Sequence, residues 1–207
     1  MITNFKLYEN FLTDKDKIKS WLDSMSIEDY TINPDLTVDV NGYVDISKKN
    51  LTEIPVQFGI VKGTFYCNHN FLTNLIGAPS NIKNSLYCNN NILSNLIGAP
   101  SIINGSVYCY NNQLTTLTGV PSTIEGEFVC SNNPLEDIND LDSKILIKSI
   151  EYTRYWITEI EEKTWDKYFD HWINKDPDIF IHLKDKISDT IKNKYDYLFN
   201  AEKFDLI

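Results

Sequence analysis

The sequence predicts an α/β solenoid of about five turns with helical segments at both ends. The main observation is a 21-residue repeat, whose lines begin at Gly63, Asn84, Gly105 and Gly126, with a weaker copy from Gly42. A fixed period in the twenties is typical of a solenoid in which each repeat contacts mainly its neighbours. Apolar residues at helical spacing before and after the repeats predict the helical ends. The chain therefore divides into an N-terminal cap (1–41), a repeat array (42–150) and a C-terminal cap (151–207).

The N-terminal cap is predicted to contain a helix followed by a β-hairpin. Thr13 or Asp14 can cap the helix, which we expect to run to about Met25 because apolar residues recur at helical spacing. The alternating segments 36–40 and 43–46 flank Asn41-Gly42, a strong hairpin signal. We expect the two segments to pair antiparallel and to cover the exposed edge of the array.

The columns of the repeat show what each position does. Two apolar positions lie two residues apart and therefore face the same side of a strand, which we take as the core. The first of these columns holds Phe65, Leu86, Val107 and Phe128, and the second holds Cys67, Cys88, Cys109 and Cys130. Glycine and proline recur at fixed offsets in the ten residues that return to the next strand, which predicts turns or extended segments there instead of a full helix.

Together the columns spell x-L-x-L-x-x-N-x-L-x-x-L, with Phe, Val or Cys at some leucine positions. This pattern resembles the leucine-rich repeat family, in its short 21-residue form with Tyr-Cys in the strand, which we associate with bacterial and phage proteins. The resemblance covers residues 42–150. It implies a parallel sheet on the concave side, one strand per turn, and an asparagine ladder inside the bend. That structural ladder would consist of Asn70, Asn91, Asn112 and Asn133.

An independent physical reason supports the same role for these asparagines. A buried bend leaves peptide groups unpaired at a cost of about 1–3 kcal/mol each, and a carboxamide offers both donors and acceptors. In the first copy Lys49 occupies the asparagine position, so we expect the ladder to begin one turn later.

The four cysteines all fall in one repeat column, which predicts buried reduced thiols that act as small apolar groups. Side chains that stand side by side in a column do not face each other as a disulfide requires. They also lie along a line and do not converge on a point as metal ligands do. A metal or redox role is the lesser alternative.

Composition and charge exclude several classes of function. The net charge is −10, with the acidic residues mainly at the two ends, and no basic stripe is present to bind a phosphate backbone, which disfavours nucleic acid. We see neither an apolar run long enough to cross a bilayer nor a secretion signal. We therefore expect a cytoplasmic protein with no membrane partner, in the host cytoplasm if it is phage-encoded.

Catalytic motifs are missing from the sequence. The three histidines have no accompanying ligand set, and we find neither a nucleophile motif nor a glycine-rich phosphate loop. We therefore expect no enzymatic activity, no cofactor and no metal.

The predicted functional surface is the concave strand face. Positions between the apolar columns face outward and carry Tyr, Asn and Ser, which are common contact residues in binding surfaces. The predicted protein-binding residues are Asp45, Tyr66, Asn68, Tyr87, Asn89, Tyr108, Tyr110, Val129 and Ser131. A third outward ladder holds Tyr43, Thr64, Ser85, Ser106 and Glu127. The competing interpretation is that stacked tyrosines only stiffen the sheet through cross-strand contacts.

We therefore predict a non-enzymatic, monomeric protein-binding module, a bacterial or phage interaction or host-modulating factor whose partner is a protein of unknown identity. In the alternative, the acidic helices of residues 151–207 bind or inhibit a basic partner, or carry an unrecognised enzymatic activity, with the repeats as scaffold. Self-association through an incompletely covered sheet edge is a third possibility.

Overall fold

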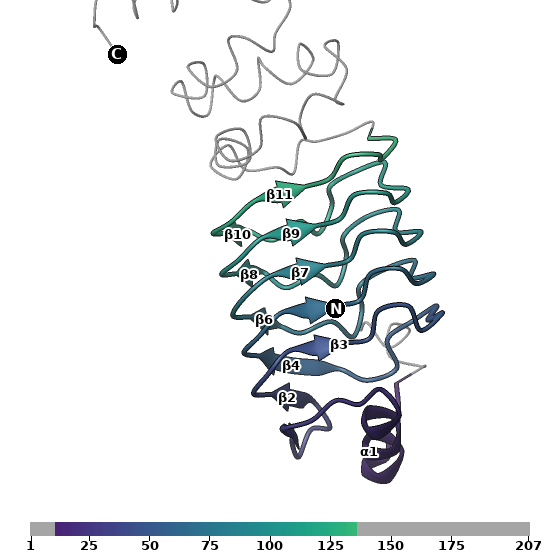
Figure 1. The fold of residues 1–207 in the computed structure, drawn as a ribbon, viewed down its shortest axis with the longest axis vertical. Coiled ribbons are helices and arrows are strands. Elements are labelled where there is room, and N and C mark those ends of the chain that lie inside the picture. The colour runs from purple at the N-terminus through teal and green to yellow at the C-terminus, as the bar shows by residue number, and fades with distance from the viewer. Residues whose placement is uncertain (1–10, 136–207) are drawn as a thin grey trace, which may run out of the picture.

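Two sheets of short strands follow the coil of the chain in the computed structural model (Figure 1). The structure describes residues 11–135. The rest of the predicted array at 136–150, including its last strand at 144–150, lies outside the described residues. So do the predicted C-terminal cap and the acidic helices at 151–207.

Each 21-residue turn adds one strand to each of the two sheets. Sheet A has six strands, in the order β1 (Tyr30–Ile32), β2 (Val38–Val40), β4 (Phe58–Val61), β6 (Asn81–Ile82), β8 (Ile102–Ile103) and β10 (Thr123–Ile124). Sheet B has five, in the order β11 (Phe128–Val129), β9 (Val107–Tyr108), β7 (Leu86–Tyr87), β5 (Phe65–Tyr66) and β3 (Val44–Asp45). Figure 1 shows the turns stacked one above the next.

The register of the strands confirms the repeat. In sheet B, Phe65 pairs with Leu86 and Tyr66 with Tyr87, so equivalent positions of successive repeats lie side by side. The described part forms a β-solenoid of about four turns, whereas the sequence predicted about five. The difference arises because the copy that begins at Gly126 continues beyond Leu135, outside the described residues.

The core lies between the two sheets. Sheet B contributes the two predicted columns, in which Phe65, Leu86 and Val107 are fully buried. Sheet A contributes a further column that the sequence prediction did not include, and its members are Val61, Ile82, Ile103 and Ile124. Burial of one such side chain contributes roughly 1.5–3 kcal/mol, so a column repeated in every turn stabilises the whole coil.

Asparagine side chains bond the backbone at the bend that follows each sheet B strand. Asn91 Oδ1 accepts a hydrogen bond from Leu72 N at 3.0 Å, while Nδ2 donates to the carbonyls of Cys67 and Cys88 at 3.0 and 3.1 Å. One side chain therefore joins the backbone of two successive turns. Equivalent bonds are made by Asn70, Asn112 and Asn133.

The return segments of each turn are extended, as predicted, and they also pair. Their short strands form sheet A, whose parallel register is again set by the 21-residue period, for example in the pairing of Ile82 with Ile103. The sequence predicted a single sheet. Two-residue strands that lie between a Gly-x-Pro turn and the next corner are too short to produce a recognisable alternation.

The N-terminal segment contains α1 (Lys15–Ser24), which agrees with the predicted helix. Asp14 accepts hydrogen bonds from the amides of Asp16 and Lys17, so the expected residue caps the helix. Ile18 and Leu22 of α1 are buried in the same core cluster as the repeats.

The predicted hairpin is wrong, because its two arms belong to different sheets. The segment 36–40 does not pair with 43–46 around Asn41-Gly42. Instead β2 pairs antiparallel with β1 and parallel with β4. Asn41-Gly42 forms the corner that leads from sheet A to sheet B, the same corner that Lys62-Gly63 forms one turn later. Pairing with the next turn of the solenoid buries Val38 and Val40 in the core, and this explains the preference over a local hairpin.

Candidate functional site

Three tyrosines stack on the outward face of sheet B, one from each of β5, β7 and β9. The ring centroids of Tyr66 and Tyr87 are 4.9 Å apart with an interplanar angle of 25°, and those of Tyr87 and Tyr108 are 4.5 Å apart at 21°. All three rings are half-buried. We call this set the tyrosine ladder, and it forms a continuous aromatic strip across three turns.

The environment of Tyr87, the middle ring of the ladder, favours the protonated form of its hydroxyl group. Partial burial, and then the neighbouring phenol of Tyr108, raise the pKa of Tyr87 to about 12. The hydroxyl of Tyr108 donates to Glu127 Oε2 at 3.3 Å. The strip therefore presents aromatic surface together with a Tyr87 hydroxyl group that stays protonated at neutral pH.

The ends of the ladder's column differ in exposure. Asp45, at its start, is exposed, whereas Val129, at its other end, is only 1% exposed. The side chain of Val129 is therefore not displayed, although its position in the column predicted display. The accessible part of the column consists of Asp45 and the three tyrosines.

The adjacent column is less accessible than its outward position predicted. Its members are Ser47, Asn68, Asn89, Tyr110 and Ser131. Asn89 is 2% exposed and Ser131 is 6% exposed, while the other three are half-buried. The Oδ1 atoms of Asn68 and Asn89 are buried, and neither accepts a hydrogen bond from residues 11–135. This column therefore displays less polar surface than its outward position predicted.

The third outward column joins successive turns to one another. The amide of Ser106 donates to Ser85 Oγ at 3.0 Å, and the amide of Glu127 donates to Ser106 Oγ at 3.0 Å. Thr64, in the same column, is buried. Tyr43, at the start of the column, is exposed, with 66% of its surface accessible.

The cysteine column lies in the core, as predicted. Cys67, Cys88 and Cys109 are buried and Cys130 is partly buried, and none forms a disulfide. Burial raises the pKa of the Cys88 thiol to about 12 and raises the pKa of Cys67 and of Cys109 well above the ordinary value. Within residues 11–135, no cluster of three or more His, Cys, Asp or Glu side chains is arranged to hold a metal ion.

Sequence reasoning missed a second amide ladder, on the outside of the bend. Asn132 Nδ2 donates to Asn111 Oδ1 at 2.7 Å, and Asn111 Nδ2 donates to Asn90 Oδ1 at 3.0 Å. These residues have positive φ values between 52° and 55°, a conformation that asparagine tolerates better than most residues. The signal was present in the Asn-Asn pairs at 90–91, 111–112 and 132–133, whose second members alone we assigned to a ladder, while the first repeat has His69 before Asn70.

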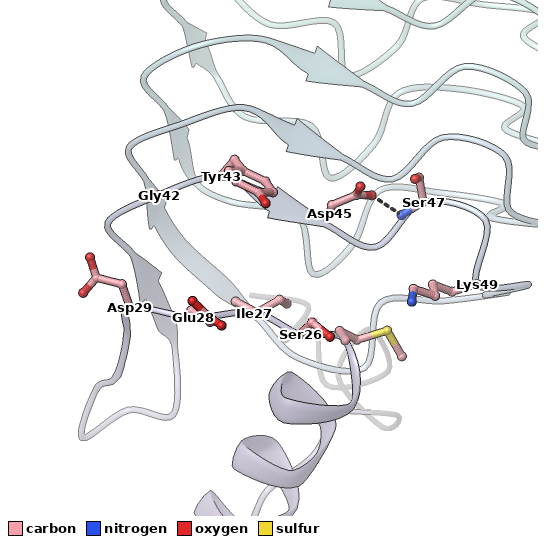
Figure 2. Close-up of a pocket in the computed structure, with 10 residues that line it drawn as sticks. Ser26, Ile27, Glu28, Asp29, Gly42, Tyr43, Asp45, Ser47 and Lys49 are labelled. Atoms are coloured by element: carbon pink, nitrogen blue, oxygen red, sulfur yellow. Dashed lines mark hydrogen bonds between the residues drawn. The ribbon is translucent and has the colours of Figure 1, made fainter.

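Sequence reasoning also missed a hollow of about 660 Å³ at the N-terminal end of sheet B. Figure 2 shows it between two stretches of backbone, β3 with Tyr43, Asp45 and Ser47 on one side and the segment 26–29 on the other. A smaller hollow of about 390 Å³ lies beside it and includes Tyr43 and Tyr66 in its lining. The two hollows share Tyr43, which connects the edge of sheet B to the start of the tyrosine ladder.

The fold and these surfaces define a β-solenoid repeat protein. A scan against protein-family models finds no matching family, and searches of curated proteins and of solved structures find no match either. In the part of the chain that the structure describes, no helix has the length and apolar character needed to cross a bilayer.

Proposed function

We propose that this solenoid is a non-enzymatic protein-binding module whose contact surface is the tyrosine ladder of sheet B. The observation that carries the proposal is the stacking of three tyrosine rings at centroid distances of 4.9 and 4.5 Å on an outward face. Tyrosines at binding surfaces supply a large contact area at low entropic cost, and rings already held in a stack lose even less freedom on binding.

The groups around the ladder support the same function. The adjacent column places Asn68 and Tyr110, both half-buried, beside the rings. Polar side chains next to aromatic anchors can supply the hydrogen bonds that orient a partner.

The competing interpretation gives the ladder a purely structural role. Stacked aromatic pairs contribute about 0.5–1.5 kcal/mol beyond their area, so the ladder also stabilises the coil. Stability and binding can be separated experimentally, because a structural role predicts loss of stability without selective loss of a partner.

The test is affinity capture with the full chain immobilised, using lysate of the source cells and quantitative mass spectrometry. The variant Tyr66→Ala/Tyr87→Ala/Tyr108→Ala should recover the partner at least about 10-fold less than the native chain, as expected for loss of aromatic anchors. A cooperative unfolding transition of each bait in urea, measured before immobilisation, establishes that the variant is folded.

The matched control is Ile60→Ala/Ile102→Ala. Both isoleucines are 43% exposed and lie in one outward column of sheet A, away from the ladder. The control should recover the same partner as the native chain. Equal recovery of every captured protein by the tyrosine variant and the native chain would refute the proposed surface.

We further assign the array to the leucine-rich repeat type, because the asparagine bonds and the apolar columns follow the pattern of that family. In this assignment α1 and the β1–β2 hairpin serve as the N-terminal cap. The burial of Ile18 and Leu22 among the core residues supports that role.

A further inference from the structure

Sheet A and sheet B end differently on the N-terminal side. In sheet A, β2 is followed by β1, which pairs with it antiparallel. In sheet B, β3 is the last strand and pairs only with β5. In the part of the chain that the structure describes, no strand lies on the other side of β3.

The unpaired edge of β3 can be identified atom by atom. The backbone amides of Val44 and Ile46 donate to the carbonyls of Thr64 and Tyr66 in the next turn. The backbone N–H groups of these even-numbered residues therefore point toward β5. The backbone of Asp45 points the opposite way, and its N–H and C=O bond to no group of residues 11–135. In the next turn the outward residue Tyr66 uses its amide and carbonyl to pair with β3. Asp45 thus offers the same donor and acceptor, and no strand within residues 11–135 receives them.

A hollow lies beyond this edge. The 660 Å³ hollow runs between β3 and the segment 26–29, as Figure 2 shows, and its volume is in the range of about 300–1,000 Å³ typical of ligand sites. Five residues of β3 and its flanks, 43–47, span about 17 Å of edge at the usual strand rise. Glu28, on the opposite wall, also makes no backbone hydrogen bond to the described residues.

The charges of the lining indicate the chemistry of the occupant. Glu28, Asp29 and Asp45 line the hollow, against a single Lys49, and all four side chains are exposed. None of the four is in an ion pair within residues 11–135. An occupant with basic side chains would therefore gain favourable electrostatic contacts with Glu28, Asp29 and Asp45.

We propose that this groove binds an extended basic peptide segment of a partner protein, which adds to β3 as a further strand of sheet B. The partner's backbone would pair with Asp45 N and O, as in other cases of strand addition at a sheet edge. Side chains of neighbouring strands stack in columns about 4.8 Å apart, so a lysine or arginine in register would lie beside the Asp45 carboxylate. This site does not depend on the tyrosine ladder.

The test uses the full chain and synthetic acetylated, amidated hexapeptides, with binding measured by calorimetry. The basic probe alternates lysine and threonine, and the two control probes are its glutamate counterpart and a version with alternate amides methylated on one edge. We expect the lysine peptide to bind at least about 10-fold more tightly than either control, because the glutamate peptide reverses the charge and N-methylation removes the pairing edge.

Variants of the groove locate the binding site. Asp45→Ala and Asp45→Pro both remove the carboxylate, but only Asp45→Pro removes the edge N–H, which the native fold leaves unpaired, so the fold should tolerate it. Asp45→Pro should bind the lysine peptide at least about 5-fold more weakly than Asp45→Ala. Glu28→Gln should weaken binding about 3-fold, whereas Asp16→Asn, the same loss of charge on α1 outside the groove, should leave it unchanged.

Several outcomes would overturn the proposal. Equal affinity for the lysine and glutamate peptides would exclude a basic occupant, and full affinity for the methylated peptide would exclude strand addition even if Asp45→Pro failed to fold. Equal weakening by Asp16→Asn and Asp45→Ala would indicate non-specific attraction. A concentration-dependent dimer that Asp45→Pro abolishes, without peptide binding, would assign the groove to a second copy. The tyrosine triple variant should bind the peptide normally, so the two proposals fail separately.

Discussion

At the scale of single residues, the solenoid depends on side chains that replace missing backbone partners. Each bend after a sheet B strand leaves amides and carbonyls that no strand can pair, and one asparagine per turn bonds three of them. Asn91 is 7% exposed and connects Leu72 with two cysteine carbonyls of successive turns. Such a residue contributes much more than an average surface asparagine, because its removal leaves three buried groups without partners.

We predict that Asn91→Ala lowers the free energy of unfolding by about 3 kcal/mol, because the three backbone groups stay buried without partners. Urea denaturation followed by circular dichroism measures this loss. The control is Asn104→Ala, whose side chain is exposed and makes no hydrogen bond within residues 11–135, and it should change stability by less than about 0.5 kcal/mol. A cost below about 1 kcal/mol for Asn91→Ala would contradict a supporting role for the ladder.

The sequence predicted the inward-facing columns of the repeat better than the outward-facing ones. Asn70 and Cys67 were assigned correctly to the bend and the core because identical residues recur in identical columns, and burial constrains a column strongly. The exterior was harder to predict. Asn89 is 2% exposed although it lies in an outward column, since neighbouring side chains of other turns decide the exposure of a short polar group. The periodicity identifies the direction of a side chain but not what covers it.

At the scale of elements, glycine determines how closely two turns can approach each other. Gly77, Gly98 and Gly119 recur at one position of the repeat, with φ values of 94°, 94° and 87°. A Cβ added to Gly98 would lie 2.4 Å from the backbone of Ile76 and Leu75 in the preceding turn. This position therefore requires glycine twice, once for its dihedral angle and once for the space.

We predict that Gly98→Ala destabilises the solenoid by more than about 1 kcal/mol, because both the left-handed conformation and the backbone contact exclude a side chain. Gly42→Ala is the matched control. A Cβ there would meet nothing within 4 Å, and its φ is not positive, so we expect a small gain of about 0.4–1 kcal/mol from the stiffer unfolded chain. Thermal denaturation of both variants measures the change in stability. Similar changes for Gly98→Ala and Gly42→Ala would refute this account.

The elements themselves were only partly predictable. The helix at 15–24 was foreseen because its apolar residues recur at helical spacing and Asp14 stands at its start. The pairing of segment 36–40 was not foreseen. Asn41-Gly42 has the residues of a tight hairpin turn, but its position in the 21-residue period makes it a corner between the two sheets. Val38 and Val40 pair with Phe58 and Val61 of the next turn, so a long-range period overrode a strong local signal.

At the scale of the whole molecule, the coil leaves its two sheets with unequal N-terminal edges. Natural sheet proteins usually cover such an edge, because its free amides and carbonyls can recruit other strands. Here β1 covers sheet A, while β3 of sheet B faces an acidic hollow. The tyrosine ladder lies on the same sheet. Both proposed binding surfaces therefore belong to sheet B, and sheet A serves mainly to close the core.

The column of buried thiols predicts how the stability of the whole coil depends on pH. The pKa of Cys88 is raised from its ordinary value of 9.0 to about 12 by burial, and the pKa values of Cys67 and Cys109 are also raised well above 9.0. The folded state thus keeps protons that the unfolded chain loses above pH 9.0. The stabilisation is fully present below that pH, and it is lost progressively as the pH rises toward the folded-state values.

We therefore predict a free energy of unfolding that is insensitive to these thiols below pH 9.0 and falls above it, with a slope of up to about 1.4 kcal/mol per pH unit for each buried thiol. Urea denaturation between pH 9.0 and pH 10.0 measures this slope before tyrosines, with an ordinary pKa of 10.0, contribute strongly. Cys88→Ala should reduce this slope by the contribution of one thiol, independently of how much the substitution lowers the free energy of unfolding at neutral pH. An unchanged slope in Cys88→Ala would mean that the thiol is already solvated in the folded protein, and the orientation of the whole cysteine column would then be wrong.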